Sequence, residues 1–213
     1  MAMTERGRFI TLEGGEGAGK STLLAGLREH LESRGIDLLL AREPGGTALG
    51  EAVRAIVLDP AQRALCAESE LLLMFAARAQ LVRETLAPAL VAGRWVLCDR
   101  YVDASYAYQG GGRGQPVERI AALEQWACDG LRPDLTLLLD LPVAAGRARA
   151  AGRGEADRIE VEADGFFERV RATYRARAAA EPQRFRVIDA SQSPEAVLRD
   201  AIAATTHLFG VGA

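Results

Sequence analysis

Residues 14–21 read GGEGAGKS, a match without gaps to the phosphate-loop pattern G-x-x-x-x-G-K-[ST]. In such a loop, successive backbone N–H groups point at a phosphate, and the dipole of the following helix adds favourable potential. The pattern brings Lys20 within reach of the β- and γ-phosphates and places the Ser21 hydroxyl where it can ligate Mg²⁺. We therefore predict a nucleoside triphosphate site made by Gly14, Gly15, Glu16, Gly17, Ala18, Gly19, Lys20, Ser21 and Thr22.

The residues on either side of this loop favour that interpretation. Residues 9–13 are apolar and β-prone, and residues 22–34 read as a helix, so the loop joins a strand to a helix N-terminus. The alternative is a glycine-rich turn that contains Gly-Lys-Ser by chance. The strand before the loop and the helix after it argue against that alternative.

Composition limits the rest of the chain. Its 213 residues suit one α/β domain, spanning 1–213, and leave little room for a second. The 26 Lys and Arg residues against 29 Asp and Glu give a formal net charge of −3. No global positive charge draws the chain to nucleic acid or to an anionic membrane, so we expect anion recognition to be local.

The cysteines and the apolar runs point to a cytoplasmic protein. Cys66, Cys98 and Cys128 are odd in number and far apart, and no CxxC or Cys/His cluster exists. Neither a disulfide framework nor a zinc site is therefore indicated. No apolar run approaches the length of a membrane span, and the N-terminus lacks the apolar core of a signal peptide.

Apolar strand patterns alternate with helical patterns along the chain. Strands are predicted at 9–13, 37–41, 95–99, 135–140 and 185–189. Helices are predicted at 20–34, 48–58, 68–92, 117–130, 143–151, 159–180 and 194–208. Several strands are continuous apolar runs, which is typical of strands buried on both faces of a parallel sheet. The alternation predicts a doubly wound, three-layer α/β/α sandwich with a five-stranded parallel sheet.

Polar residues follow four of these strands, where ligands bind in open α/β sheets. Glu13 precedes the phosphate loop, residues 42–47 (REPGGT) follow the second strand, residues 99–101 (DRY) follow the third, and Asp140 ends the fourth. Together they predict one ligand site at this edge of the sheet.

The DRY sequence supplies two candidate groups for phosphoryl chemistry. Asp99 ends an apolar strand, a position from which a carboxylate can coordinate Mg²⁺ directly or through water. Arg100 can hold phosphate oxygens with two parallel donors. A structural aspartate that caps the next helix, beside a surface arginine, is the alternative.

Taken together, the motifs of this chain resemble those of the bacterial thymidylate kinase family, and they occur in the same order. The matching segments are GGEGAGKS, REPGGT, LLLMFAARAQ at 71–80, DRY, YQGGGRG at 108–114, RPDLTLLLDLP at 132–142 and RARAAGRGEADRIE at 147–160. The phosphate loop alone is common to many proteins, whereas the combination is far more specific. The resemblance implies a P-loop kinase fold with a short mobile lid, which transfers the γ-phosphoryl group of MgATP to dTMP and yields dTDP and ADP.

The resemblance also implies an acceptor site. Phe75 and Arg78 share one helix face, where the ring would stack on the pyrimidine and the guanidinium would donate to its O4 carbonyl. Periodicity alone favours a place for Phe75 in the helix core, and only the resemblance to the family favours the stacking role. Tyr108 and Gln109 would line the deoxyribose and the base, with the following glycines letting the backbone approach the nucleotide; the alternative is a flexible surface loop.

Three charged residues are the candidates for holding the rest of dTMP. By resemblance, Glu16 accepts a hydrogen bond from the 3′-hydroxyl of the acceptor, although a solvated loop carboxylate fits the sequence as well. Arg42 and Arg100 are the candidates for the acceptor phosphate, and Arg100 is the stronger of the two.

The segment at about 147–158 carries four arginines and two glycines, the composition of a mobile anion clamp. A solvated basic helix end is the alternative. Because residues 16–18 contain no basic residue, the loop resembles the arrangement in which the lid supplies the transition-state arginine. Arg153 is the leading candidate, surrounded by Arg147, Arg149 and Arg158.

Two further functions compete with this hypothesis. One is a kinase that acts on another nucleoside monophosphate, and the other is a P-loop ATPase or switch that regulates a protein partner. A switch needs a water-positioning residue and switch segments, to which the REPGGT loop and the short lid give little support. The resemblance further implies a homodimer.

Overall fold

A computed structural model of the chain describes residues 6–151 and 156–209. Its centre is an all-parallel sheet of five strands in the order β2-β3-β1-β4-β5. The strands are β1 (Phe9–Gly14), β2 (Leu38–Arg42), β3 (Trp95–Asp99), β4 (Leu135–Asp140) and β5 (Phe185–Asp189). The predicted five-stranded parallel sheet is confirmed, and each predicted strand agrees with an observed one to within a residue at each end.

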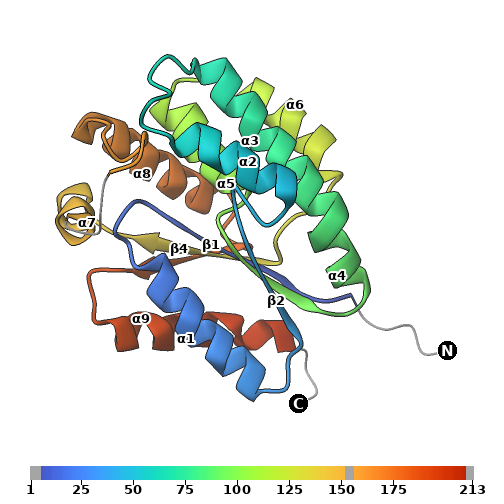
Figure 1. Ribbon diagram of the computed structural model, residues 1–213. Helices are drawn as coiled ribbons and strands as arrows, with labels where there is room; N and C mark the ends of the chain where they lie inside the picture. The colour runs from blue at the N-terminus through green and yellow to red at the C-terminus, as the bar shows by residue number, and fades with distance from the viewer. Residues whose placement is uncertain (1–5, 152–155, 210–213) are drawn as a thin grey trace.

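Helices cover both faces of the sheet (Figure 1). One face carries α1 (Lys20–Ser33) and α9 (Pro194–Thr205), which pack against each other. The other carries the larger layer, formed by α3 (Ala67–Leu81), α4 (Ala87–Val91), α5 (Val102–Ser105), α6 (Val117–Cys128) and α8 (Asp164–Ala180). Helix α2 (Ala48–Leu58) packs on α3. Helix α7 (Val143–Ala150) follows β4 and packs on α8.

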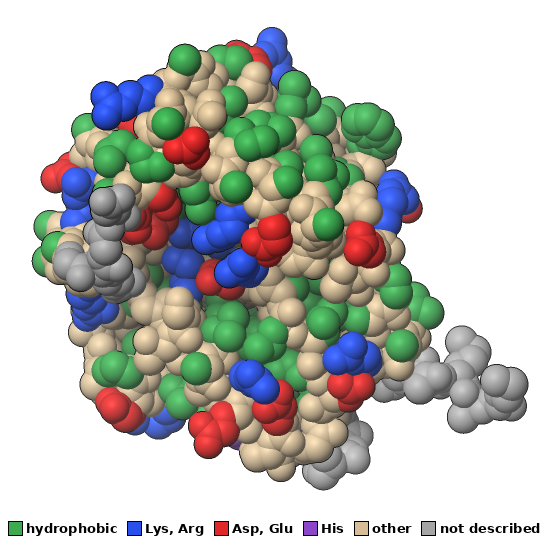
Figure 2. Space-filling model, in the orientation of Figure 1, with side chains coloured by type: hydrophobic (Ala, Val, Ile, Leu, Met, Phe, Trp, Pro, Cys, Tyr) green, Lys and Arg blue, Asp and Glu red, His purple; other side chains and the backbone are tan. Residues whose placement is uncertain are grey.

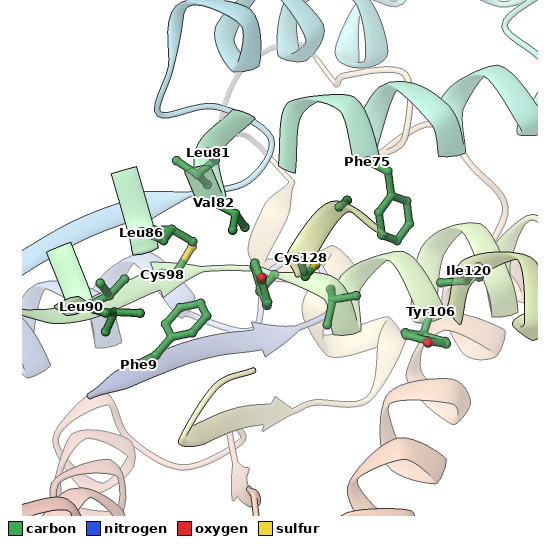
Figure 3. Packing of buried hydrophobic residues seen from close by; sticks show 14 of the residues in the cluster. Phe9, Phe75, Leu81, Val82, Leu86, Leu90, Cys98, Tyr106, Ile120 and Cys128 are labelled. Carbon is green, nitrogen blue, oxygen red and sulfur yellow. The ribbon is translucent and has the colours of Figure 1, made fainter. Parts of the chain in front are cut away.

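The strands read as apolar runs because the sheet is buried on both faces. Phe9 and Cys98 face the core shared with α3, α4 and α6 (Figure 3), and Val96 belongs to the same core. Ile10 and Leu12, which alternate with Phe9 along β1, face the opposite core beneath α1 and α9. Residues of the same strand therefore support both layers.

The predicted helix at 68–92 is interrupted. After α3 the chain makes a π-helical segment at Val82–Leu86 before α4 begins. Pro88 in the first turn of α4 has no N–H to donate to the preceding turn, which accounts for the break in the regular hydrogen-bond ladder.

The helix predicted at 159–180 begins at Asp164 instead. The Asp157 carboxylate accepts hydrogen bonds from the backbone N–H groups of Ile159 and Glu160, at 2.8 and 2.9 Å. An aspartate side chain that bonds the backbone two and three residues ahead favours a turn over a helix. The turn therefore delays the start of α8.

The YQGGGRG segment is not a flexible loop. It is largely a π-helix, Tyr106–Gly112, packed on α8. A Cβ on Gly111 would lie 2.1 Å from the Thr173 hydroxyl, and one on Gly112 would lie 2.4 Å from the Phe166 ring. These two glycines permit close packing against α8, so the alternative of a flexible surface loop is wrong.

Candidate functional site

A cavity of about 410 Å³ opens at the carboxyl end of the sheet, beside the phosphate loop. Figure 2 shows Lys and Arg side chains gathered in a hollow at the middle of this face, with acidic side chains beside them. Of the predicted site residues, the cavity is lined by Glu16, Gly17, Ala18, Gly19, Lys20, Ser21, Thr22, Arg42, Asp99, Arg100, Tyr108, Gln109 and Arg158. The structure therefore brings together most of the residues that the sequence analysis selected.

The conformation of the phosphate loop depends on its glycines and on contacts with neighbouring elements. Gly19 has a φ of +94° and stands immediately before α1, so that the loop enters the helix through a left-handed residue. Gly17 lies against α7, since a Cβ there would be 2.0 Å from the Gly146 carbonyl oxygen. Gly14 and Gly15 border a smaller adjoining pocket and hold the Lys20 ammonium through their carbonyl oxygens, at 3.1 and 3.0 Å.

Lys20 is buried, and this burial changes its titration. Desolvation, followed by the charge of Arg100, lowers the pKa of the Lys20 ammonium to about 8. Glu16, Asp99 and Glu13 act in the opposite direction by favouring the charged form. A phosphate bound in the loop would stabilise the charged form of this ammonium group.

Arg100 is fixed by a hydrogen-bond network at the end of β3. It has a φ of +69°, rare for a residue with a side chain, and its guanidinium lies over the Tyr108 ring at 4.8 Å. It donates to Gly14 O at 3.0 Å and to Glu16 at 2.7 Å. Tyr108 also donates to Glu16, at 2.9 Å, so the loop carboxylate is fixed as well.

Asp99 supplies one unsatisfied carboxylate oxygen. Its Oδ1 is buried and has no hydrogen-bond partner, and both Asp99 and Ser21 line the cavity. One hydroxyl and one carboxylate suit Mg²⁺ that takes its other ligands from phosphate oxygens and water. Within residues 6–151 and 156–209, no group of three or more His, Cys, Asp or Glu is arranged to hold a metal by itself.

Two of the four polar strand ends, Glu13 and Asp140, lie outside the main cavity and are bound by other protein groups. Glu13 is fully buried and accepts hydrogen bonds from Tyr174 OH at 2.7 Å and from the Tyr101 N–H at 2.8 Å. Burial, and secondly the negative charge of Asp103, raises the pKa of Glu13. Asp140 is paired with Arg171 at 2.7 Å. Neither the Glu13 nor the Asp140 carboxylate lines the main cavity.

Phe75, predicted to stack on the base, lies in the core. It is 3 % exposed and points from α3 into the cluster that contains Tyr106 and Ile120 (Figure 3). It does not line the cavity, whereas its neighbour Met74 does. The helix face that carries Phe75 turns toward the sheet, and the wall of the cavity at this point of α3 is Met74.

Arg78 is fully buried and does not line the cavity. Its guanidinium stacks on Phe75 at 4.5 Å and donates to Glu43 at 2.8 Å, as well as to Ser105 Oγ at 2.9 Å. Burial raises the pKa of Glu43, against the effect of Arg78. Glu43 does line the cavity. Arg78 therefore contacts a cavity-lining residue without lining the cavity itself.

The arginines of the predicted lid have separate surroundings. Arg158 is buried, donates to Val57 O at 2.8 Å and pairs with Glu70 at 2.5 Å. Arg147 lies near Asp164, and Arg149 donates to Ala190 O, both away from the main cavity. Arg153 lies outside the described residues.

Arg42 lines the cavity from the exposed end of β2 and pairs with Glu51 at 2.9 Å. Four further charged residues line the cavity that were not among the predicted site residues, namely Glu43, Arg54 on α2, Glu70 on α3 and Asp157. A helical projection of α2 could have found Arg54, because Arg54 adjoins the buried positions Val53 and Val57. Nothing in the sequence alone singled out Glu70.

A parallel sheet, a phosphate loop entering a helix and a cavity lined by both basic and acidic side chains define a P-loop nucleotide phosphotransferase. The thymidylate kinase family model matches residues 12–201. Thymidylate kinases similar to this chain occur in Alkalilimnicola ehrlichii, 60 % identical over 91 % of this chain and 89 % of that protein, and in Pseudomonas putida strain GB-1, 59 % identical over 91 % and 92 %. The thymidylate kinase of Halorhodospira halophila is 53 % identical over 99 % of both chains. This chain belongs to the thymidylate kinase family, as its motifs led us to expect.

Proposed function

We propose that this protein transfers the γ-phosphoryl group of MgATP to the phosphate of dTMP, yielding dTDP and ADP. Family membership supports this activity and gives no support to a switch or regulatory ATPase. The observation that carries the proposal is one cavity that joins the phosphate loop to Arg100, Tyr108 and Gln109. A donor site and an acceptor site that share one space are what in-line transfer requires.

The residues divide between the two substrates. On the donor side, Lys20 and the loop N–H groups hold the ATP phosphates. On the acceptor side, Arg100 holds the dTMP phosphate, supported by Arg42, and Glu16 accepts from the 3′-hydroxyl. An oxygen of the dTMP phosphate attacks the γ-phosphorus, the bond to the β-bridging oxygen breaks, and ADP leaves. The attacking oxygen is already anionic, so no general base is needed.

Ser21 and Asp99 are the residues that would hold Mg²⁺ beside the ATP phosphates. The unpartnered Asp99 Oδ1 supports this assignment. Mg²⁺ bound there would neutralise charge on the phosphate oxygens. Asp99→Asn, which keeps the shape but removes the charge, should raise the Mg²⁺ concentration needed for half-maximal activity.

The base pocket is formed by Met74, Tyr108 and Gln109, with Glu43 at its edge. Met74 supplies the apolar surface that the sequence analysis assigned to Phe75, and a thioether packs well against a ring. Arg78 acts through Glu43, which it holds in place by a buried ion pair.

Arg153 remains the proposed transition-state arginine because the phosphate loop and the lid resemble the family arrangement in which the lid supplies that residue. Arg153→Ala should depress turnover much more than dTMP binding, because a cation that acts in the transition state contributes little to the ground state. A raised KM for dTMP with unchanged turnover would contradict this role.

A homodimer is proposed on the same family basis. Leu72 on α3 and Trp126 on α6 are 57 % and 78 % exposed, on helices that pack against each other. Large apolar side chains exposed on neighbouring helices favour an interface. Light scattering of the wild-type protein and of Trp126→Ser would test the proposed dimer.

We also retain the cytoplasm as the proposed location. Among the described residues, no helix has the length and apolarity to cross a membrane.

The test of the activity is the stoichiometry of its products. With MgATP and dTMP, dTDP and ADP should appear in equal amounts, and chelation of Mg²⁺ should stop both. ADP without dTDP would show hydrolysis and would contradict the proposal.

A further inference from the structure

Glu70 lies at the junction between the base pocket and the segment that precedes α8. It is 1 % exposed, lies in the first turn of α3 and lines the cavity. Its two carboxylate oxygens have different partners. Oε1 accepts from Gln109 Nε2 at 2.8 Å, and Oε2 accepts from Arg158 at 2.5 Å and from Arg113 at 3.2 Å.

This division fixes the orientation of the Gln109 amide. An ionised carboxylate can only accept hydrogen bonds, so Gln109 must turn its NH₂ group toward Glu70. Its carbonyl oxygen is then left over, and that oxygen, Oε1, is buried without a partner. Because Gln109 lines the cavity and is 4 % exposed, a bound ligand is the natural source of the missing donor.

We propose that Glu70 is a positioning residue that makes Gln109 an acceptor for the ring N–H of a pyrimidine. Thymine and uracil carry a hydrogen on N3, whereas N3 of cytosine is a lone-pair acceptor. When the Gln109 oxygen faces the base, it accepts a hydrogen bond from N3–H of thymine or uracil. Against cytosine, the same oxygen would face the N3 lone pair, and no hydrogen bond could form. The inference rests on the proposed placement of the acceptor base beside Gln109, and it assigns the choice between these bases to a carboxylate that need not touch them.

The arginines on the other oxygen complete the arrangement. Arg158 and Arg113 together occupy Oε2, which leaves Oε1 for Gln109. Arg158 is itself held by Val57 O and, through its backbone N–H, by Leu58 O. The carboxylate is therefore anchored from both sides, and its orientation does not depend on the ligand.

Glu70→Gln tests this assignment because it keeps the shape and reverses one hydrogen bond. The oxygen of the introduced amide can still accept from the arginines, which leaves the NH₂ group of that amide facing Gln109. Gln109 must then turn its own oxygen toward position 70 and present its NH₂ group to the cavity. We expect kcat/KM for dTMP to fall by roughly 10- to 100-fold, and the preference for dTMP over dCMP to fall by at least about tenfold.

The chain offers a matched control. Glu68, on the same helix, accepts from Gln115 Nε2 at 3.2 Å, and neither residue lines the cavity. Glu68→Gln should leave the preference for dTMP over dCMP unchanged. In Glu70→Gln, the preference for dTMP over dUMP should also stay within about twofold of wild type, because both bases carry the N3 hydrogen.

A Glu70→Gln protein that keeps the wild-type preference for dTMP over dCMP would overturn the inference, as would an equal loss in Glu68→Gln. If Glu70→Gln does not fold, N3-methyl-dTMP replaces it as the probe of the wild-type enzyme. We expect it to be at least about tenfold poorer than dTMP, and equal use of both would also overturn the inference. If no acceptor stimulates ADP release by the wild-type protein, it is the proposed function that fails.

Discussion

Arg100 donates a hydrogen bond of 2.7 Å to Glu16, so the cation assigned to the acceptor phosphate is paired with the carboxylate assigned to the acceptor sugar. The side chain of Arg100 is 17 % exposed and that of Glu16 is 26 % exposed, which keeps the pair open to the cavity. The ion pair therefore fixes the distance between the group assigned to the acceptor phosphate and the group assigned to the acceptor sugar.

Removal of this cation should abolish most of the activity. Arg100→Ala is expected to lower kcat/KM for dTMP about 100-fold or more, because a positioned guanidinium stabilises the charge that develops on the phosphates. Arg100→Lys should recover little, since lysine lacks the planar pair of donors. Arg28→Ala, which breaks an exposed ion pair on α1, serves as the control and should have no effect. Steady-state kinetics would decide, and an Arg100→Ala enzyme close to wild type would refute the role.

Binding of ATP should weaken at alkaline pH. The pKa of Lys20 in the free protein is lowered to about 8, mainly by burial, whereas a bound phosphate favours the ammonium form. Above that pH the site must take up a proton to bind ATP. The association constant should therefore fall by up to about tenfold per pH unit once the pH exceeds the Lys20 pKa of about 8.

Calorimetry between about pH 7 and 9.5 in buffers of different ionisation heat would detect this proton uptake. Lys20→Arg, which stays charged throughout, should bind with less dependence on pH. An affinity that is flat across this range in the wild-type protein would show that Lys20 does not titrate there.

Met74 and Phe75 should separate binding from stability. Met74→Ala removes a cavity wall and is expected to raise KM for dTMP several-fold. Phe75→Leu lies in the core and should lower the free energy of unfolding by about 1–2 kcal/mol while leaving KM unchanged. Kinetics and urea unfolding of both variants would check this, and a larger KM effect in Phe75→Leu would return the stacking role to Phe75.

Gly146 should matter for ATP binding although it lies on α7. A Cβ at this position would be 2.4 Å from the Glu16 carbonyl oxygen, so Gly146→Ala must displace the phosphate loop. We expect ATP affinity to fall about tenfold or more, although replacing glycine by alanine within a helix usually stabilises the helix. Gly165→Ala on α8 is the control, because the nearest atom to its Cβ would be a flexible arginine nitrogen at 3.8 Å. Equal ATP affinity of the two variants would contradict the expected contact.

The strands could be predicted from sequence because each is a short apolar run bounded by turn residues. The phosphate loop and DRY could be located because their chemistry requires particular residue types at fixed spacing. The side chains of α3 could not be assigned in the same way. Phe75 and Met74 are adjacent and both apolar, and only the packing of α3 against the sheet decides which of them faces the ligand.

Arg78 and Glu70 show a second limit. Both are charged residues on a helix rich in apolar ones, and their partners Glu43, Gln109 and Arg158 are far away in sequence. Helical periodicity identifies the face on which a residue lies but not the distant groups that it meets. The π-helix at Tyr106–Gly112 escaped prediction because its glycines normally indicate a loop, whereas packing on α8 stabilises it.

The most direct test of the central claim is ADP release from MgATP with dTMP, dUMP, dCMP, dGMP or no acceptor. Strong stimulation by dTMP, weaker stimulation by dUMP and negligible stimulation by the others is the result that we predict. Equal ADP release in every case, including the sample without an acceptor, would contradict the assignment of an acceptor site and leave only the nucleotide-binding loop.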